Sequence, residues 1–280
     1  MSGTQHIVNM PDDALRDAIA AAGLDNLDGA FAFRDGDDLH KPNLGTRRRT
    51  RVVLRDAAGR ECQLFLKRYG PEPFLRRLRR CVFSLASLSW MKSPARVEFD
   101  AIAATRAAGV PTMDALALGQ SCPLTDGRSF LLVSTVPGQS LERQHNAFAT
   151  DTAHTHSTLA PALADLVRTF HAAGLVHRDL YTSHIFLSHS DGTQQGDAFE
   201  LHLIDLARVF RPVAWRRFRW QVKDLAALHF SLPPKWVANH WQDFLIGYLG
   251  ETTVRQMARW TKAIEKKSNK MARRAARKNA

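Results

Sequence analysis

Two aspartates in the second half of the chain are placed where they could act together on a phosphoryl group. Asp179 lies in the stretch His177 to His184, which reads HRDLYTSH, and Asp205 follows the apolar pair Leu203 and Ile204. A short apolar strand follows the first aspartate and another precedes the second, so a hairpin can bring both carboxylates to one site. Phosphoryl transfer needs one carboxylate to orient a hydroxyl and one to hold a metal ion on the nucleotide phosphates. The pattern therefore predicts kinase chemistry.

A lysine and a glutamate in the first half of the chain could form the nucleotide side of such a site. Lys67 ends the apolar run Gln63 to Lys67, where alternation places it on the same face of a strand as Phe65. Glu98 lies early in a helix predicted over about 94–108, which begins at Ser93-Pro94. An ion pair between them would hold the lysine on the α- and β-phosphates of ATP. Taken alone, Lys67 is better explained as a side chain that reaches the solvent, and only Glu98 makes a role in the site the better explanation.

The pattern of apolar residues predicts an α+β protein with two lobes. Residues 31–69 are predicted to be mainly β, with a hairpin at the turn Asp56 to Gly59, and residues 130–136 form a buried strand. The sequence Pro137-Gly138 breaks that strand, so the N-terminal lobe is predicted to span 1–136 and the C-terminal lobe 137–280. The predicted elements of the second lobe are helices over 161–173, 234–249 and 252–277, a helix starting at Asp224, and strands over 184–187 and 199–204.

The composition is that of a globular protein with an unusual charge. Among 280 residues, 39 are basic and 27 acidic, which gives a net charge of +12 and favours anionic partners. Nucleic acid is disfavoured because no nucleic-acid-binding motif accompanies the charge. The three cysteines, Cys62, Cys81 and Cys122, form no metal-binding or disulfide pattern, which fits a reducing cytosol. No signal peptide is recognisable, and the longest apolar run, 81–91, is too short to span a bilayer.

Two segments combine basic residues with helical periodicity. One covers 72–93 and includes Arg76, Arg77, Arg79 and Arg80, and the other is the predicted C-terminal helix. Such segments can bind the anionic surface of a membrane, or they can be helices with a solvated basic face. A third basic stretch, 41–49, holds only one glycine where a kinase would cover the phosphates with a glycine-rich loop. Its arginines could contact phosphate, or form a solvated turn.

Taken together, these motifs resemble a known family. The stretch 177–184, the run 203–206, the segment 223–231 (KDLAALHFS), Lys67 and Glu98 are similar to the lipopolysaccharide core kinases, the bacterial heptose and Kdo kinases. The resemblance spans about residues 50–231 and implies a protein-kinase-like fold. Three positions depart from the protein-kinase pattern: Tyr181 replaces a lysine for the γ-phosphate, Ala207 replaces a glycine, and the glycine-rich loop is missing. The short distance from Asp205 to Asp224 also favours a small or lipid-linked acceptor over a protein.

The resemblance implies a role for each of these residues. Asp179 would be catalytic and orient the acceptor hydroxyl, and Asp205 would bind Mg²⁺. Lys67, held by Glu98, would bind ATP. His184 stands where protein kinases place a metal-binding asparagine, and a structural role suits it as well as a metal role because imidazole is a poor ligand for Mg²⁺. Arg178 and Asp224 would tie the loop backbone to the neighbouring helix.

The predicted function is ATP-dependent phosphorylation of a sugar hydroxyl, on heptose or Kdo, of lipid-linked lipopolysaccharide core. The predicted location is cytoplasmic, peripheral at the cytoplasmic face of the inner membrane, with the basic segments on the anionic surface. One alternative is a kinase for another small-molecule or protein acceptor. Another is a pseudokinase-type module that binds an anionic glycolipid or partner without catalysis. The sequence does not define an oligomeric state.

Overall fold

The chain divides into two compact units. The computed structural model describes residues 5–8, 12–39, 47–71, 92–121, 126–144, 153–189 and 199–279, with the backbone alone at 5–8, 153–158 and 278–279. Unit 1 comprises Met1–Ala103 and Met113–Thr135, and unit 2 comprises Ala104–Thr112 and Val136–Ala280. The second segment of unit 2 thus begins at the residue after Thr135, and the end of the helix predicted over 94–108 also belongs to unit 2.

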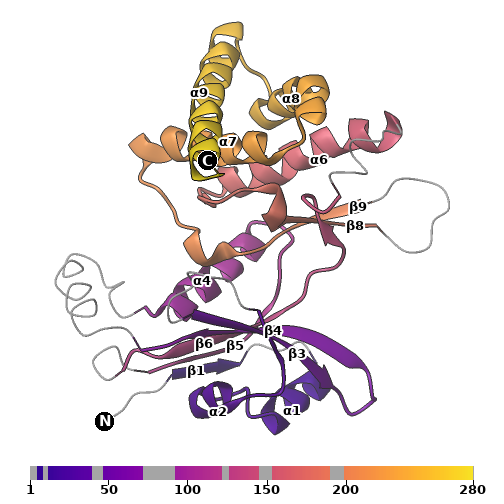
Figure 1. Cartoon of the computed structure of the whole chain (residues 1–280), viewed down its shortest axis with the longest axis vertical. Coiled ribbons are helices and arrows are strands. Elements are labelled where there is room, and N and C mark those ends of the chain that lie inside the picture. The colour runs from indigo at the N-terminus through magenta and orange to yellow at the C-terminus, as the bar shows by residue number, and fades with distance from the viewer. Residues whose placement is uncertain are drawn as a thin grey trace. The chain divides into compact units, whose positions relative to one another are not determined.

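Unit 1 is built on a six-stranded antiparallel sheet (Figure 1). Its order is β1-β5-β6-β4-β3-β2, so β4 lies between β6 and β3. The strands are β1 (Gln5–Val8), β2 (Asp37–Asp38), β3 (Arg47–Arg55), β4 (Glu61–Tyr69), β5 (Ala115–Gln120) and β6 (Ser129–Ser134). The hairpin predicted at the turn Asp56 to Gly59 is confirmed as β3 and β4, and Gly59 in this turn has a φ of +76°. That φ lies in the left-handed region, which glycine adopts without steric cost.

Alternation along β4 separates the core from the candidate site. Leu64 and Leu66 are buried in a cluster with Ile19, Leu24 and Leu132 on the face covered by α1 (Asp13–Ala21) and α2 (Leu27–Ala32). Because successive side chains on a strand point to opposite faces, Lys67 and Tyr69 lie on the other face, towards α4 (Pro94–Ala107).

The prediction of β structure from residue 31 onwards is wrong at its start, because Phe31 and Ala32 end helix α2. The Oδ1 atom of Asn26 accepts a hydrogen bond from the backbone N–H of Gly29 at 2.8 Å and caps this helix. Gly29 must be small, since a Cβ there would lie 2.0 Å from the carbonyl oxygen of Gly23. Phe31 and Phe33 alternate as in a strand. The cap at Asn26 and the close approach of Gly29 to Gly23 stabilise a short helix instead.

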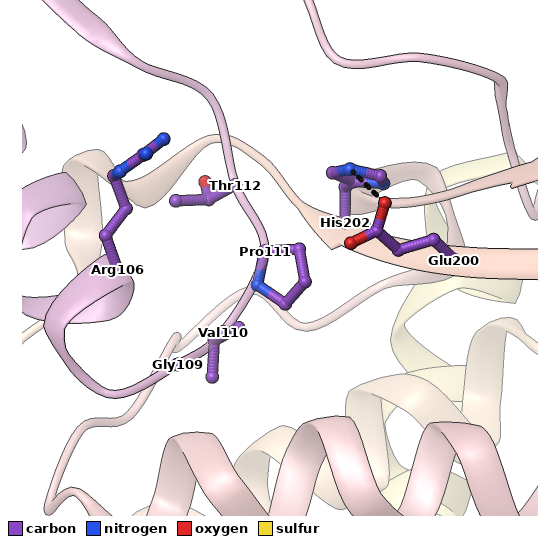
Figure 2. A pocket seen from close by; sticks show the side chains of 7 residues that line it. All are labelled: Arg106, Gly109, Val110, Pro111, Thr112, Glu200 and His202. Carbon is purple, nitrogen blue, oxygen red and sulfur yellow. Dashed lines mark ion pairs between the residues drawn. The ribbon is translucent and has the colours of Figure 1, made fainter.

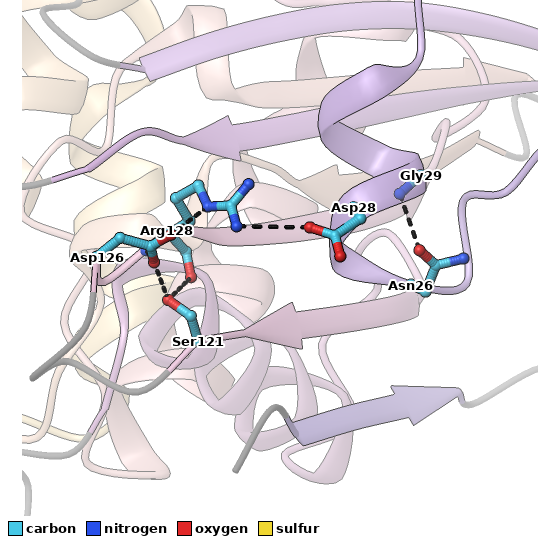
Figure 3. A network of polar contacts seen from close by, with 6 residues as sticks. All are labelled: Asn26, Asp28, Gly29, Ser121, Asp126 and Arg128. Atoms are coloured by element: carbon cyan, nitrogen blue, oxygen red, sulfur yellow. Dashed lines mark hydrogen bonds and ion pairs between the residues drawn. The ribbon is translucent and has the colours of Figure 1, made fainter. Parts of the chain in front are cut away.

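A polar network ties the ends of β5 and β6 to α2 (Figure 3). Asp126 accepts hydrogen bonds from Ser121 and from the backbone and guanidinium of Arg128, and Arg128 Nη2 lies 3.4 Å from Asp28 Oδ1. Burial raises the pKa of the Asp126 carboxyl, but the hydrogen bonds from Ser121 and Arg128 outweigh burial and lower it. The charged carboxylate therefore stabilises the edge of unit 1.

Unit 2 is mainly helical and also holds a small three-stranded sheet (Figure 1). Its helices are α6 (Ala153–Ala172), α7 (Arg217–Ser231), α8 (Pro234–Leu249) and α9 (Val254–Asn279), and α6 packs on α8 while α7 packs on α9. The sheet pairs β7 (Gln139–Ser140), β8 (Ile185–His189) and β9 (Phe199–Leu203) in that order. The described residues of unit 2 also include the 3-10 turns η2 (Thr182–His184), η3 (Leu206–Arg208) and η4 (Ala214–Arg216). The helices predicted over 234–249 and 252–277 and the strands predicted over 184–187 and 199–204 are confirmed. Each of their ends lies within two residues of the predicted end.

Two helices of unit 2 start earlier than predicted. Helix α6 begins at Ala153 and contains Pro161, which the sequence suggested as the first residue. Helix α7 begins at Arg217, so Asp224 lies in its middle, where it is buried and contacts the loop that starts at His177. The basic segment 72–91 and the start of the stretch 41–49 lie outside the described residues. Within the described ranges, no helix has the length and apolar character needed to cross a membrane.

Candidate active site

In unit 1, Lys67 and Glu98 form the predicted ion pair. Both side chains are buried, and the Lys67 ammonium group contacts Glu98 Oε1. The Tyr69 hydroxyl donates a hydrogen bond to Glu98 Oε2 at 2.7 Å, so both carboxylate oxygens have a partner. Burial first, and then the charge of Glu98, raises the pKa of Tyr69 and keeps the hydroxyl protonated. Lys67 is therefore held by a carboxylate that is itself fixed.

The start of helix α4 fixes the position of Glu98. The Ser93 hydroxyl accepts a hydrogen bond from the backbone N–H of Arg96 at 3.1 Å and donates one to Gln120 Oε1 at 2.7 Å. Pro94 follows as the first helical residue, where its missing N–H costs nothing. The cap thereby attaches the helix to β5, and Glu98 lies one turn further along on the face towards β4.

In unit 2, Asp224 holds the backbone of the predicted catalytic loop. This carboxylate is fully buried in α7 and accepts hydrogen bonds from the backbone N–H groups of His177 at 2.6 Å and Arg178 at 2.7 Å. Arg178 adopts a left-handed backbone with a φ of +72°, which is uncommon for a residue with a side chain. Its guanidinium lies 5.7 Å from the ring centre of Phe210 and 5.5 Å from that of Trp220. The architectural roles expected for Arg178 and Asp224 agree with these contacts.

His177 connects the predicted catalytic loop, residues 177–184, to the segment that carries Asp205. Its Nε2 lies 3.0 Å from the carbonyl oxygen of Ile204, which can only accept, so this nitrogen carries the proton. Burial is the main cause that lowers the pKa of His177, and the buried ring is neutral. Asp205 follows Ile204 with a left-handed φ of +59°. One buried imidazole thus sets the distance between the two segments that carry the aspartates.

The Asp179 carboxylate is paired with an arginine that the sequence analysis did not single out. Arg208 Nη1 lies 2.7 Å from Asp179 Oδ2, and about half of the Arg208 side chain is exposed, at 50%. Lys223 lies nearby on α7 and donates a hydrogen bond to the carbonyl oxygen of Arg178. Burial lowers the pKa of Lys223 most strongly, and the charge of Asp179 opposes that shift. A positive environment therefore surrounds the carboxylate.

His184 lies between the two aspartates. Its Nδ1 donates a hydrogen bond to the backbone carbonyl of Asp179 at 2.8 Å, and its Nε2 lies 3.6 Å from Asp205 Oδ2. The ring stacks on His177 with centres 5.8 Å apart. Asp179, His184 and Asp205 thus form one group within unit 2, and Lys67 and Glu98 form another within unit 1.

The residues at Asp205 fit a magnesium ion that is shared with a nucleotide. Because Nδ1 of His184 carries the ring proton, a neutral ring has its lone pair on Nε2, on the side of Asp205. Among the described residues, no cluster of three or more histidines, cysteines or carboxylates could hold a metal ion alone. One carboxylate and one imidazole leave most positions to phosphate oxygens and water, which is how Mg²⁺ is usually bound.

Of the two partners that the sequence motifs did not indicate, Tyr69 could have been found from the sequence and the contact of Arg208 could not. Tyr69 is two residues after Lys67 in the same strand, so alternation places it beside Glu98. Arg208 follows Asp205 by three residues, and this spacing is visible in the sequence. Its contact with Asp179 depends on the bridge between Val176 and Phe210, which no local pattern encodes.

A separate cavity of about 350 Å³ lies in unit 2 (Figure 2). Its walls are the loop Gly109–Thr112, Arg106, Glu200 and His202. His202 Nε2 lies 3.4 Å from Glu200 Oε2, and burial is the main cause that lowers the pKa of His202. The backbone N–H of Leu203 donates to the carbonyl of Pro111 at 2.9 Å, which joins this loop to β9. None of the predicted site residues lines the cavity.

The fold and the loop geometry define a protein-kinase-like protein. A solved structure described as "WaaP in complex with acyl carrier protein" matches with a TM-score of 0.67 and 25% sequence identity, over 95% of this chain and 98% of that one. The family model of the lipopolysaccharide kinase (Kdo/WaaP) family matches residues 48–248. The chain belongs to this family. The fold class and the family resemblance predicted from the sequence are thereby confirmed.

Curated relatives carry the name lipopolysaccharide core heptose(I) kinase WaaP. The protein from Pseudomonas aeruginosa is 37% identical over 145 residues, which cover 49% of this chain and 52% of that protein. The protein from Escherichia coli is 34% identical over 158 residues, which cover 55% of this chain and 59% of that protein. The matched regions thus span only about half of the length of the curated relatives.

Proposed function

We propose that this chain is an ATP-dependent kinase that phosphorylates a sugar hydroxyl, on heptose or Kdo, of lipid-linked lipopolysaccharide core. The observation that carries the proposal is the group Asp179, His184 and Asp205 in unit 2, in a chain of the lipopolysaccharide kinase family. The curated relatives act on core heptose by name, which favours heptose over other acceptors. A lipid-linked acceptor places the reaction at the cytoplasmic face of the inner membrane.

Asp179 orients the acceptor. Its carboxylate accepts a hydrogen bond from the sugar hydroxyl and aims the oxygen at the γ-phosphorus of ATP. A bond forms between that oxygen and phosphorus, the bond to the β-phosphate oxygen breaks, and ADP leaves. An aspartate is a weak base near neutral pH, so positioning contributes more than early removal of the proton, which leaves late through Asp179.

Three groups compensate the phosphate charge. Mg²⁺, when bound, would neutralise the β- and γ-phosphates, with Asp205 and His184 as its protein ligands. Lys67, held by Glu98 and indirectly by Tyr69, binds the α- and β-phosphates. Arg208 is placed beside Asp179 and three residues after Asp205, so its exposed guanidinium can contact the phosphoryl group in transfer.

The test of this function is phosphate transfer by purified protein with Mg-ATP and a panel of acceptors that includes heptose- and Kdo-containing core, other sugars and a protein. We expect transfer to core sugar, and we expect Asp179→Ala to lower it by at least about 100-fold because the hydroxyl loses its orientation. Stabilisation of the protein by Mg-ATP should persist in that variant.

The matched control is Asp165→Ala, since Asp165 is an exposed aspartate whose ion pair with Arg168 is also 2.7 Å long. Transfer that survives in Asp179→Ala would refute the role of Asp179. Transfer only to another acceptor would replace the substrate, and a wild-type protein that neither transfers phosphate nor is stabilised by ATP would favour a pseudokinase-type binding module.

We also propose an acyl carrier protein as a partner, because the solved WaaP is in complex with one and matches nearly the whole chain. Purified chain and acyl carrier protein should elute together in size-exclusion chromatography, and the complex should melt at a higher temperature than the free chain. Separate elution, with no change in melting temperature, would contradict this partner.

A further inference from the structure

The net positive charge of the chain comes from its last quarter. Residues 211–280 hold 16 lysines and arginines and only four aspartates and glutamates, so this segment accounts for the entire net charge of +12. The first 210 residues carry 23 basic and 23 acidic side chains and are balanced. In the structure the basic segment includes the turn η4 and the helices α7, α8 and α9.

Helix α9 directs its charge away from the protein. Ile264 and Ser268 are buried and lie on the stripe that faces α7. The other face of the helix includes Lys266, Lys270 and Arg274, which are exposed. Among the described residues, no carboxylate forms an ion pair with any of these three cations. This half of the helix therefore presents uncompensated charge to the solvent.

The segment before α7 exposes apolar side chains among arginines. Val213 is 56% exposed and Trp215 is 75% exposed, which is unusual for a tryptophan in a folded protein. The Arg216 guanidinium lies 4.2 Å from the centre of the Trp215 ring. Such an arrangement leaves an indole and a guanidinium free to enter the same interface.

The two basic regions adjoin each other. Phe218 packs edge-on against Trp260 of α9 with ring centres 4.7 Å apart, which fixes the start of α7 on α9. Arg219 follows directly, and its charge, with those of Lys270 and Arg274, contributes to the lowered pKa of Lys267 after the larger effect of burial. Cations from both helices thus repel one another, and a bound anion would relieve this repulsion.

We propose that this surface docks on an anionic lipid bilayer. Its residues, here called the basic-aromatic face, are Val213, Trp215, Arg216, Arg219, Lys267, Lys270 and Arg274. Tryptophan is favoured at the boundary between headgroups and acyl chains, and clustered lysines and arginines are attracted to anionic headgroups. A bilayer needs no acidic residue on the protein, and the face has none. The inference rests on the proposed function only in that a lipid-linked acceptor gives membrane contact a purpose.

The test is sedimentation of the full chain with vesicles, in the absence of ATP and acceptor. One set of vesicles is phosphatidylcholine alone, and the other contains about one third phosphatidylglycerol. The double variant Trp215→Ser, Arg216→Glu changes the start of α7, and Lys270→Glu, Arg274→Glu changes α9. The control Val254→Ser, Lys235→Glu makes the same kinds of change at residues that are also exposed in unit 2. Melting temperatures verify that every variant is folded.

We expect wild-type protein to bind the anionic vesicles, to bind neutral ones much more weakly, and to dissociate when salt is raised from about 0.1 M to about 0.5 M. Each face variant should lose about tenfold or more in affinity, and the control should stay within about twofold. Equal binding by face variants and control would overturn the proposal. So would face variants that bind vesicles normally but lose affinity for an acidic protein or for nucleic acid. Because no phosphate is transferred in this assay, its result is independent of the kinase assay.

Discussion

Tyr181 occupies the loop position where the protein-kinase pattern has a lysine for the γ-phosphate, and the structure places a different cation beside that loop. Arg208 extends from η3 and contacts the Asp179 carboxylate at 2.7 Å. Tyr181 cannot supply that positive charge, because a phenol is either neutral or anionic, and burial and the charge of Asp179 raise the pKa of its hydroxyl further. An arginine fork can bind a carboxylate and then a phosphoryl oxygen without changing its own charge.

If Arg208 contacts the phosphoryl group in transfer, its replacement should affect the rate more than ATP binding. We expect Arg208→Gln to lower kcat by about 100-fold, with a much smaller change in KM for ATP. Arg208→Lys should recover part of that loss, because an ammonium group keeps the charge but lacks the fork. Steady-state kinetics with core acceptor measure both constants.

A suitable control is Arg168→Gln, since Arg168 is 54% exposed and pairs with an aspartate at the same 2.7 Å. This variant should behave as wild type. If Arg208→Gln raised KM for ATP and left kcat unchanged, the arginine would act in nucleotide binding and not on the transferred group.

At the scale of elements, the sequence predicted those helices and strands whose signals are local. Alternation and a glycine turn define the β3–β4 hairpin, and Ser93-Pro94 marks the start of α4. Helix α2 was missed because its cap at Asn26 competes with two nearby phenylalanines that suggest a strand. The start of α6 was missed because Pro161 is tolerated inside that helix, and a proline more often marks a boundary.

The contacts of the candidate site also divide into those that the sequence could predict and those that it could not. The pair Lys67 and Glu98 was predicted from a strand and a helix that are close in sequence, and the contact between them is confirmed. The buried partners of the catalytic loop come from further along the chain: His177 binds Ile204, and Asp224 binds the loop from 46 residues away. Motif resemblance, and not local physical chemistry, placed Asp224 there. No pattern within a few residues could show that Arg208 would meet Asp179.

For the molecule as a whole, buried histidines predict how stability depends on pH. Burial is the first cause that lowers the pKa of His177, His202 and His229. In the unfolded chain a histidine binds a proton below its usual pKa of about 6.5, while the buried ring stays neutral. The unfolded state then holds more protons than the native state, so stability falls as pH decreases below that value. The contribution of each histidine is at most about 1.4 kcal/mol per pH unit.

Urea unfolding between about pH 7 and about pH 5 should therefore show a free energy of unfolding that decreases steadily. This window separates histidines from Asp56 and Asp126, whose carboxyls in the unfolded chain titrate near pH 3.8. His177→Gln should make the slope shallower, because glutamine does not titrate and its amide can still donate a hydrogen bond to Ile204. The exposed residue His189 supplies the control, since His189→Gln should leave the slope unchanged. If both variants had the wild-type slope, His177 would be charged in the native protein, and its link between the catalytic loop and Asp205 would have to be reconsidered.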